Sequence, residues 1–242
     1  MFPVLLMILA AITPTVLLVT YFASDHRFPQ PRRVIWATFI LGVAAVVFAT
    51  AIEAGIHNLL TAAVREPMRF ALYKSFLAFA LPEEAMKFVI LRYYCMRVAS
   101  FSVPKDGLVY GATVSLGFSA FESVFYLVQG GFTWGLVFMR ALMAVPMHVA
   151  VGAVMGLILV FLRWRPAQRP AIFALAIGVP VVFHGLYNFV LLLPPYVPVP
   201  GLFEAVRGPQ SAIGIVILAA ATAVLLFRRL ASRVGVPAGR AR

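Results

Sequence analysis

Long apolar stretches alternate with short polar or proline-rich segments along nearly the whole chain. Each stretch is about the length that a helix needs to cross the hydrocarbon of a bilayer, roughly 20 residues. Seven such stretches can be read, and they are Phe2–Phe22, Val34–Ile56, Phe70–Tyr94, Gly107–Val128, Val137–Leu162, Ala171–Leu193 and Gln210–Phe227. The pattern predicts an all-α, polytopic membrane protein with seven transmembrane helices.

Composition supports this prediction. Hydrophobic residues make up 63% of the 242 residues and charged residues 12%, with a mean hydropathy of +0.98. Soluble domains have about half apolar residues and about a quarter charged residues. A soluble fold of this size could not bury so much apolar surface, whereas a lipid bilayer can accept it. The sequence shows no soluble domain, internal repeat or low-complexity tract.

Lysine and arginine are distributed unevenly. The formal net charge is +12, but the basic residues lie in short clusters between apolar stretches and form no continuous basic face, so no nucleic-acid partner is expected. Seven spans would put most of the basic residues on one side, leaving near the other side only Arg65, Arg69, Arg140 and Arg207. Because Lys and Arg favour the cytoplasmic side, the N-terminus is predicted outside and the C-terminus in the cytoplasm.

Ionisable residues inside the apolar stretches indicate a functional site. Each charge at bilayer depth costs about 2.5–3.5 kcal/mol. The residues concerned are Glu83, Glu84, Glu122, His148 and His184. The helical rise puts Glu83 and both histidines roughly 15 Å, and Glu122 roughly 10 Å, from the outer boundary. Four helices would therefore bring polar groups to similar depth, as one site in the outer half of the membrane requires.

Local spacing adds detail to this site. Lys87 lies four residues after Glu83 and three after Glu84, so it shares a helix face with them and can neutralise one carboxylate. The other carboxylate needs a further partner, which the histidines or a metal would provide. Pro82 removes one backbone hydrogen bond and would open the helix at this point. Asn188 lies four residues after His184 and shares its face.

Other residues have plainer interpretations. Gly152 and Gly156 form a small-residue face that suits close helix contact. Glu53 and His57 lie near the outer end of the second span, where a structural or gating role is expected. Cys95 is the single cysteine, which excludes an intramolecular disulfide and suggests an inert buried thiol.

Three motifs resemble those of the PrsW family of intramembrane proteases, which is akin to the CAAX prenyl-endopeptidases and bacteriocin-processing membrane proteases. Glu83–Lys87 reads EExxK, Phe118–Glu122 reads FxxxE, and His184–Asn188 reads HxxxN, with His148 on the span between the last two. The resemblance covers spans three to six. It implies a core catalytic bundle at about residues 70–193, with flanking helices in 1–56 and 210–230, all within one transmembrane domain of residues 1–242.

The resemblance implies that the chain hydrolyses a peptide bond of a membrane-anchored protein. A known family member cuts an anti-sigma factor on the extracytoplasmic side, in agreement with a site in the outer half of the bilayer. The resemblance also implies a multi-pass protein of the bacterial cytoplasmic membrane. The CAAX relatives carry EExxxR and FxxxH instead, so Glu122 puts a direct transfer of their histidine-assisted mechanism in doubt.

The residues themselves limit the mechanism. No aspartate lies inside a span, and Cys95 lies at the cytoplasmic end, far from the histidines, which leaves a glutamate/histidine site. Glu83 is the expected general base, and Glu84 would orient the site or share its proton. His184, with Asn188 on its face, would bind the substrate carbonyl or its oxyanion.

Two questions stay open at this level. Glu122, His148 and His184 would suffice to hold Zn²⁺ with one position free, but no HExxH motif is present, so metal-dependent and metal-free mechanisms both remain. Buried Glu, Lys and His also build proton relays, so an ion- or proton-coupled transporter is the alternative function. A membrane adaptor with a degenerate site is a third, although the intact motifs argue against it.

Overall fold

The computed structural model describes residues 2–24, 30–97, 101, 103–163, 165–193 and 208–233, and within these ranges the chain is helical without a strand. The long uninterrupted helices are α1 (Phe2–Ser24), α2 (Arg32–Ala63), α5 (Pro104–Gly130), α8 (Arg169–Leu192) and α10 (Pro209–Arg233). Two further helical runs contain a π turn each. They are α3 (Pro67–Tyr73), η1 (Lys74–Ala80) and α4 (Leu81–Tyr93), and α6 (Trp134–Met139), η3 (Arg140–Ala144) and α7 (Val145–Val160). The predicted all-α, polytopic class is confirmed.

Six helices in the described part of the chain are long and apolar enough to cross a membrane. They are Phe2–Ser24, Arg32–Ala63, Pro104–Gly130, Trp134–Val160, Pro166–Leu192 and Pro209–Ser232, and each overlaps one predicted span. The remaining predicted span, Phe70–Tyr94, falls on the continuous run α3–η1–α4, which carries too many charged side chains to qualify by composition alone. The total of seven spans and the direction in which they cross stay predictions.

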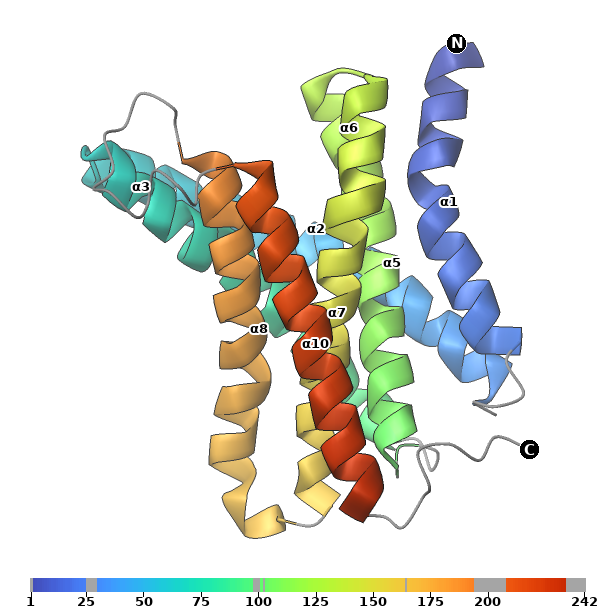
Figure 1. Cartoon of the computed structure of the whole chain (residues 1–242). Helices are drawn as coiled ribbons and strands as arrows, with labels where there is room; N and C mark the ends of the chain where they lie inside the picture. The colour runs from blue at the N-terminus through green and yellow to red at the C-terminus, as the bar shows by residue number, and fades with distance from the viewer. Residues whose placement is uncertain are drawn as a thin grey trace.

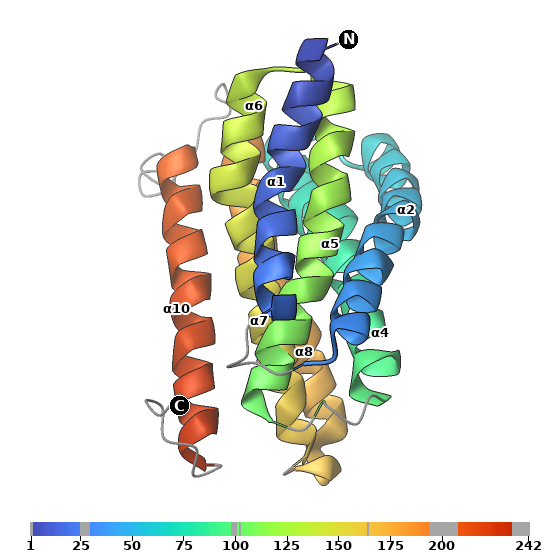
Figure 2. The same cartoon turned by 90° about the vertical axis from the view of Figure 1, so that its right-hand side faces the viewer.

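Helices α5 and α7 form the centre of the bundle. Figure 1 shows them side by side, with α8 to one side and α1 to the other, α10 running diagonally in front of them and α2 crossing the bundle obliquely. In Figure 2 the peripheral positions of α1 and α10 are clear. Within the apolar 18-residue stretch of each span, 89% of the residues are buried in the run that contains α7, but only 17% are buried in α1 and in α10. The outer helices therefore present most of their apolar side chains to the surroundings, as lipid contact requires.

Small residues allow the central helices to approach closely. A Cβ atom on Gly111 would lie 2.0 Å from the carbonyl oxygen of Gly152, and one on Gly156 would lie 1.9 Å from that of Gly107. No real Cβ contact is so short, so the backbones of α5 and α7 touch at these positions. The predicted close contact at Gly152 and Gly156 is confirmed, and it sets the distance between the helices that carry Glu122 and His148.

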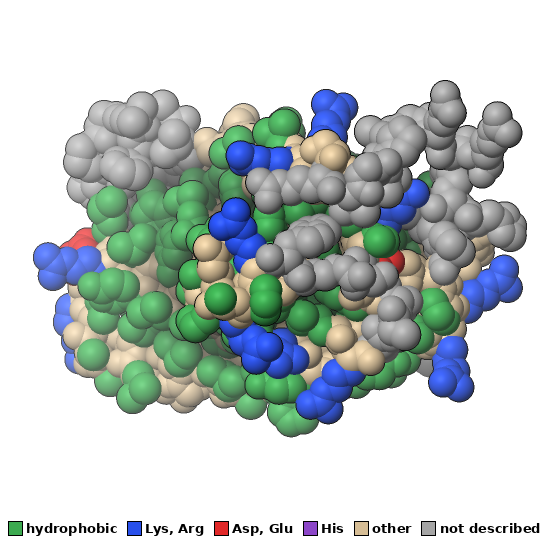
Figure 3. All heavy atoms as spheres, turned by 90° about the horizontal axis from the view of Figure 1, so that it is seen from below, with side chains coloured by type: hydrophobic (Ala, Val, Ile, Leu, Met, Phe, Trp, Pro, Cys, Tyr) green, Lys and Arg blue, Asp and Glu red, His purple; other side chains and the backbone are tan. Residues whose placement is uncertain are grey.

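Basic side chains gather at the end of the bundle where α2, α5 and α8 begin and α10 ends. Figure 3, which looks at this end, shows several separate lysine and arginine side chains scattered over the face and along its edges. Their distribution agrees with the charge asymmetry read from the sequence. Because Lys and Arg favour the cytoplasmic side of a membrane, this end is the predicted cytoplasmic face.

Replacing Gly111 with Ala should destabilise the bundle, because the new methyl group would overlap the backbone of α7. Overpacking of this kind typically costs about 1–3 kcal/mol. The thermal midpoint of the purified, detergent-solubilised protein measures the loss. Gly178→Ala is the matched control, since a Cβ on Gly178 meets nothing within 4 Å. Equal midpoints for the two variants would contradict the close contact.

Candidate active site

Two π turns precede the helical segments that carry most of the polar residues. The π turn η1 leads into α4 and η3 leads into α7, and both α4 and α7 have proline at the second position, Pro82 and Pro146. Proline has no N–H to continue the regular α-helical ladder. At these points Leu81 N–H donates to the carbonyl of Phe76 and Val145 N–H to that of Arg140, a five-residue spacing. The predicted opening of the helix at Pro82 thus takes the form of a π turn, a feature frequent at functional sites.

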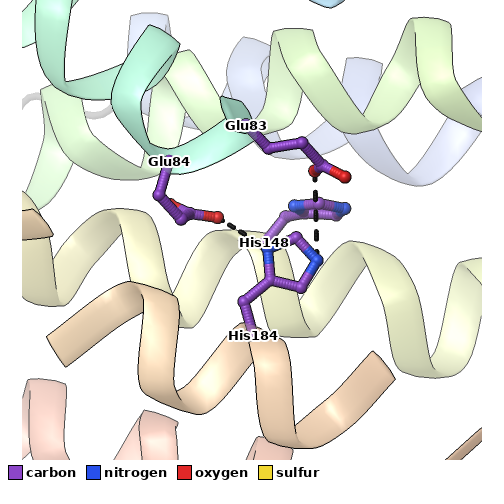
Figure 4. A group of neighbouring side chains, drawn as sticks. All are labelled: Glu83, Glu84, His148 and His184. Carbon is purple, nitrogen blue, oxygen red and sulfur yellow. Dashed lines mark hydrogen bonds and ion pairs between the residues drawn. The ribbon is translucent and has the colours of Figure 1, made fainter. Parts of the chain in front are cut away.

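Four side chains from three helices converge in the interior. Glu83 and Glu84 come from α4, His148 from α7 and His184 from α8, and Figure 4 shows the four gathered around one point. One ligand atom from each lies within 4.8 Å of every other. All four side chains are buried, with Glu84 at 0% exposure. The predicted convergence of these residues from separate helices is confirmed.

Lys87 supplies the positive charge within this group. Its Nζ atom lies 2.8 Å from Glu84 Oε1, 2.9 Å from His148 Nδ1 and 3.9 Å from Glu83 Oε2. The ammonium also lies 4.4 Å from the centre of the Phe118 ring, which favours a cation. Lys87 is fully buried. The predicted Glu–Lys pairing is confirmed, and one lysine contacts both carboxylates.

His184 is oriented by Glu84. The distance from His184 Nδ1 to Glu84 Oε1 is 2.8 Å, and that from His184 Nε2 to Glu83 Oε2 is 3.9 Å. A carboxylate paired with an ammonium accepts hydrogen bonds, so the Nδ1 atom of His184 carries the hydrogen. In the neutral ring, Nε2 carries the lone pair and faces Glu83. The two histidine rings meet edge to face with their centroids 4.9 Å apart.

Glu122 lies on the far side of His148 from this group. Its Oε2 atom lies 2.8 Å from His148 Nε2 and also accepts a hydrogen bond from Arg140 Nη2. Arg140 Nε donates to Ser123 Oγ at 2.9 Å. The sequence interpretation missed Arg140 because it counted the residue only as a charge near the outer boundary. Its position inside the predicted span Val137–Leu162 was the signal that could have found it.

The metal set expected from the sequence differs from the group that the structure assembles. Among the described residues, the potential metal-binding group is Glu83, Glu84, His148 and His184. Glu122 is instead hydrogen-bonded to Nε2 of His148, the outer ring nitrogen, which faces away from Lys87. Asn188 lies one turn beyond His184 and is half-buried, and within the described residues it makes no hydrogen bond to the cluster. Its expected role in substrate binding stays a prediction.

A cavity of about 340 Å³ opens beside the cluster, between α2, η1, α4 and α5. Glu83 and Glu122 line it, together with Glu53 and His57 from α2. Aromatic rings, among them Phe118, form much of the remaining wall. The cavity therefore connects Glu83 and Glu122 with the two α2 residues for which a structural or gating role was predicted, and that role stays a prediction.

Cys95 lies outside this site. It is buried in the short turn η2 (Cys95–Arg97), and its sulfur lies 3.5 Å from Thr38 Oγ1. Burial raises the pKa of the Cys95 thiol to about 12. A reactive cysteine needs a lowered pKa, so the thiol is unsuited to act as a nucleophile.

Comparison with known proteins identifies the family. Residues 30–226, which include every residue of the cluster, match the family model described as PrsW family intramembrane metalloprotease. The chain belongs to this family. The protease PrsW of Bacillus subtilis (strain 168) is 32% identical over 184 residues, which cover 75% of this chain and 81% of the relative. The protease PrsW of Halalkalibacterium halodurans is 30% identical over 187 residues, 76% of this chain and 82% of that relative.

No solved structure matches the chain. Membership of the PrsW family makes the protein a membrane protease, and it favours this activity over the alternative of a transporter. The six apolar helices, together with the bacterial relatives named above, support a multi-pass membrane protein.

Replacing Lys87 with Met in this PrsW-family protease should strongly destabilise it. The variant leaves two buried carboxylates without their ammonium, and removing one partner of a buried ion pair typically costs about 3–5 kcal/mol. Thermal unfolding of the purified protein measures the effect. The double variant Lys87→Met/Glu84→Gln should regain part of the loss, because it removes the carboxylate in closest contact with the lysine. A double variant no more stable than Lys87→Met would contradict the pairing.

Proposed function

We propose that this PrsW-family protease cleaves a peptide bond of a single-span, membrane-anchored protein, such as an anti-sigma factor, in the outer half of the bilayer. The convergence of Glu83, Glu84, His148 and His184 beside a cavity is the observation that carries the proposal. Amide hydrolysis needs an activated water, a donor for the carbonyl oxygen and a proton for the leaving amine. The described side chains can supply each of these.

Glu83 is the general base in this proposal. Its Oε2 atom is buried without a hydrogen-bond partner, and its side chain lines the cavity. The cavity is large enough to hold water beside the Glu83 side chain, with Glu53 and Glu122 as further polar partners in a largely apolar wall. The carboxylate takes a proton from the attacking water and passes it to the nitrogen of the leaving amine, as one group acting first as base and then as acid.

Glu84 and Lys87 orient the site. Glu84 Oε1 contacts both Lys87 Nζ and His184 Nδ1 at 2.8 Å, which fixes the lysine and the ring relative to one another. With its hydrogen on Nδ1, a neutral His184 ring has only a lone pair on Nε2 and cannot donate to an oxyanion. We therefore assign the substrate carbonyl to donors other than His184, namely the remaining hydrogen of the Lys87 ammonium and the amide of Asn188.

The cluster also fits a divalent metal by its chemistry. Two imidazoles and a carboxylate are a sufficient zinc set that leaves one position open. His148 and His184 would hold the ion together with Glu84, whose Oε2 is buried without a hydrogen-bond partner. This assignment leaves Glu83 free to act as base. When bound, Zn²⁺ would polarise the scissile carbonyl as a Lewis acid. Lys87 Nζ contacts the Nδ1 atom of His148, so the lysine and a metal would compete for it.

Replacing Glu83 with Gln should abolish cleavage of a co-expressed, epitope-tagged single-span anti-sigma factor, because an amide cannot take the proton from water. We expect a loss of at least about 100-fold, within the range for removal of a general base. Immunoblotting measures the cleaved fragment and the amount of protease. Glu66→Gln is the matched control, since the Glu66 side chain is exposed. Cleavage by Glu83→Gln at the rate of the control would exclude the proposed mechanism.

Metal analysis of the purified protein should find about one equivalent of zinc. A strong chelator should stop cleavage, and added Zn²⁺ should restore it. His148→Ala and His184→Ala should each lower the zinc content, since each removes a nitrogen ligand. Full activity of metal-free protein in the presence of chelator would contradict the metal-dependent version and leave Glu83 and Lys87 as the reacting groups.

A further inference from the structure

Arg140 is a buried arginine that the mechanism above does not use. It is 8% exposed and begins the π turn η3. Among the described residues, its hydrogen bonds and its ring contact are all to α5, because the guanidinium donates to Glu122 Oε2 and Ser123 Oγ and lies 4.7 Å from the centre of the Tyr126 ring. Three contacts to one neighbouring helix hold the guanidinium in a single position, and they hold the carboxylate of Glu122 with it.

His148 contacts the same oxygen atom of Glu122. Its Nε2 atom lies 2.8 Å from Glu122 Oε2. Since an arginine side chain only donates, the oxygen that it binds is an acceptor, and His148 Nε2 must donate to share that oxygen. On the other side of the ring, Nδ1 lies 2.9 Å from Lys87 Nζ. An ammonium also only donates, so Nδ1 must accept. Two independent contacts therefore require the same arrangement of the ring.

We propose that Arg140 is a positioning residue that acts through Glu122 to fix the tautomer of His148, with hydrogen on Nε2 and the lone pair on Nδ1 facing the cluster. A carboxylate bonded to the outer nitrogen of a histidine is a recurrent way to orient a metal ligand or a catalytic ring. Arg140 anchors that carboxylate. The tautomer is a property of the fold, whereas its importance for cleavage rests on the proposed function.

Glu84 and His184 form the same kind of pair on the opposite side of the cluster. Glu84 contacts Nδ1 of its ring and leaves Nε2 facing inward, while Glu122 contacts Nε2 of His148 and leaves Nδ1 facing inward. The two inward nitrogens are thus chemically different, and opposite tautomers are required. Lys87 fixes Glu84, and Arg140 fixes Glu122.

Selective ¹⁵N labelling of histidine tests the tautomer directly. Two-bond proton–nitrogen correlation spectra of the full-length protein in detergent distinguish the two tautomers, and His148→Gln identifies the signals of His148 by their loss. We expect the wild-type ring to carry its hydrogen on Nε2. Hydrogen on Nδ1 in the wild-type protein would overturn the proposal, whatever any variant does.

Variants of Arg140 test the function of this contact. Arg140→Met should lower the population of the tautomer with hydrogen on Nε2, because only the Lys87 contact to Nδ1 then favours it without an anchored Glu122. The variant should also weaken zinc binding in chelator competition and slow cleavage, each by about 10–100-fold. Arg140→Lys keeps a cationic donor and should retain the wild-type spectrum. Arg69→Met is the matched control, since the Arg69 side chain is 74% exposed, and it should change none of the three measurements.

The outcomes separate the two proposals. A wild-type spectrum in Arg140→Met, or a changed spectrum with unchanged zinc binding and cleavage, would overturn the positioning role. If the wild-type protein shows the expected tautomer but does not cleave the anti-sigma factor, the proposed function fails while the assignment of Arg140 to the ring of His148 stands. If Arg140→Met does not fold, the spectra of the wild-type protein and of Arg140→Lys still decide the tautomer.

Discussion

The pairing of buried carboxylates with buried positive charges is the interaction on which the rest of this structure depends. Glu83, Glu84 and Glu122 are all less than 10% exposed within a bundle of apolar helices. Isolated carboxylates in such surroundings would cost several kcal/mol each. Lys87 and Arg140 supply the countercharges, and the two histidine rings lie between the carboxylates. Contacts within the network join α4 to α7 and α8, and α7 to α5. The pairing of the charges therefore depends on the relative positions of these four helices.

The backbone is arranged to make this network possible. The π turns η1 and η3 come just before α4 and α7, where regular hydrogen bonding is interrupted ahead of a proline. The glycine contacts between α5 and α7 bring the two backbones together, which allows Glu122 and His148 to lie within hydrogen-bond distance of each other. Local departures from ideal helix geometry therefore occur next to the polar network, and the outer helices α1 and α10 contain no such turn.

The FxxxE motif gains a physical explanation from this arrangement. Phe118 contributes the aromatic face beneath the Lys87 ammonium, and Glu122, one turn later, contacts the outer nitrogen of His148. The imidazole next to this motif therefore comes from His148 on α7, and Glu122 supports that ring from α5.

The sequence alone determined the class of protein, most of the helices and the residues of the cluster. Apolar stretches of bilayer length and ionisable residues within them are local properties, readable because burying charge without a purpose is costly. Only the tertiary structure decided which atoms meet. It placed Glu122 against Nε2 of His148 instead of beside His184. It also brought the guanidinium of Arg140, which begins η3, into contact with Glu122 on α5. Such contacts depend on crossing distances and π turns, which are set by packing between helices and leave little trace in the periodicity of one helix.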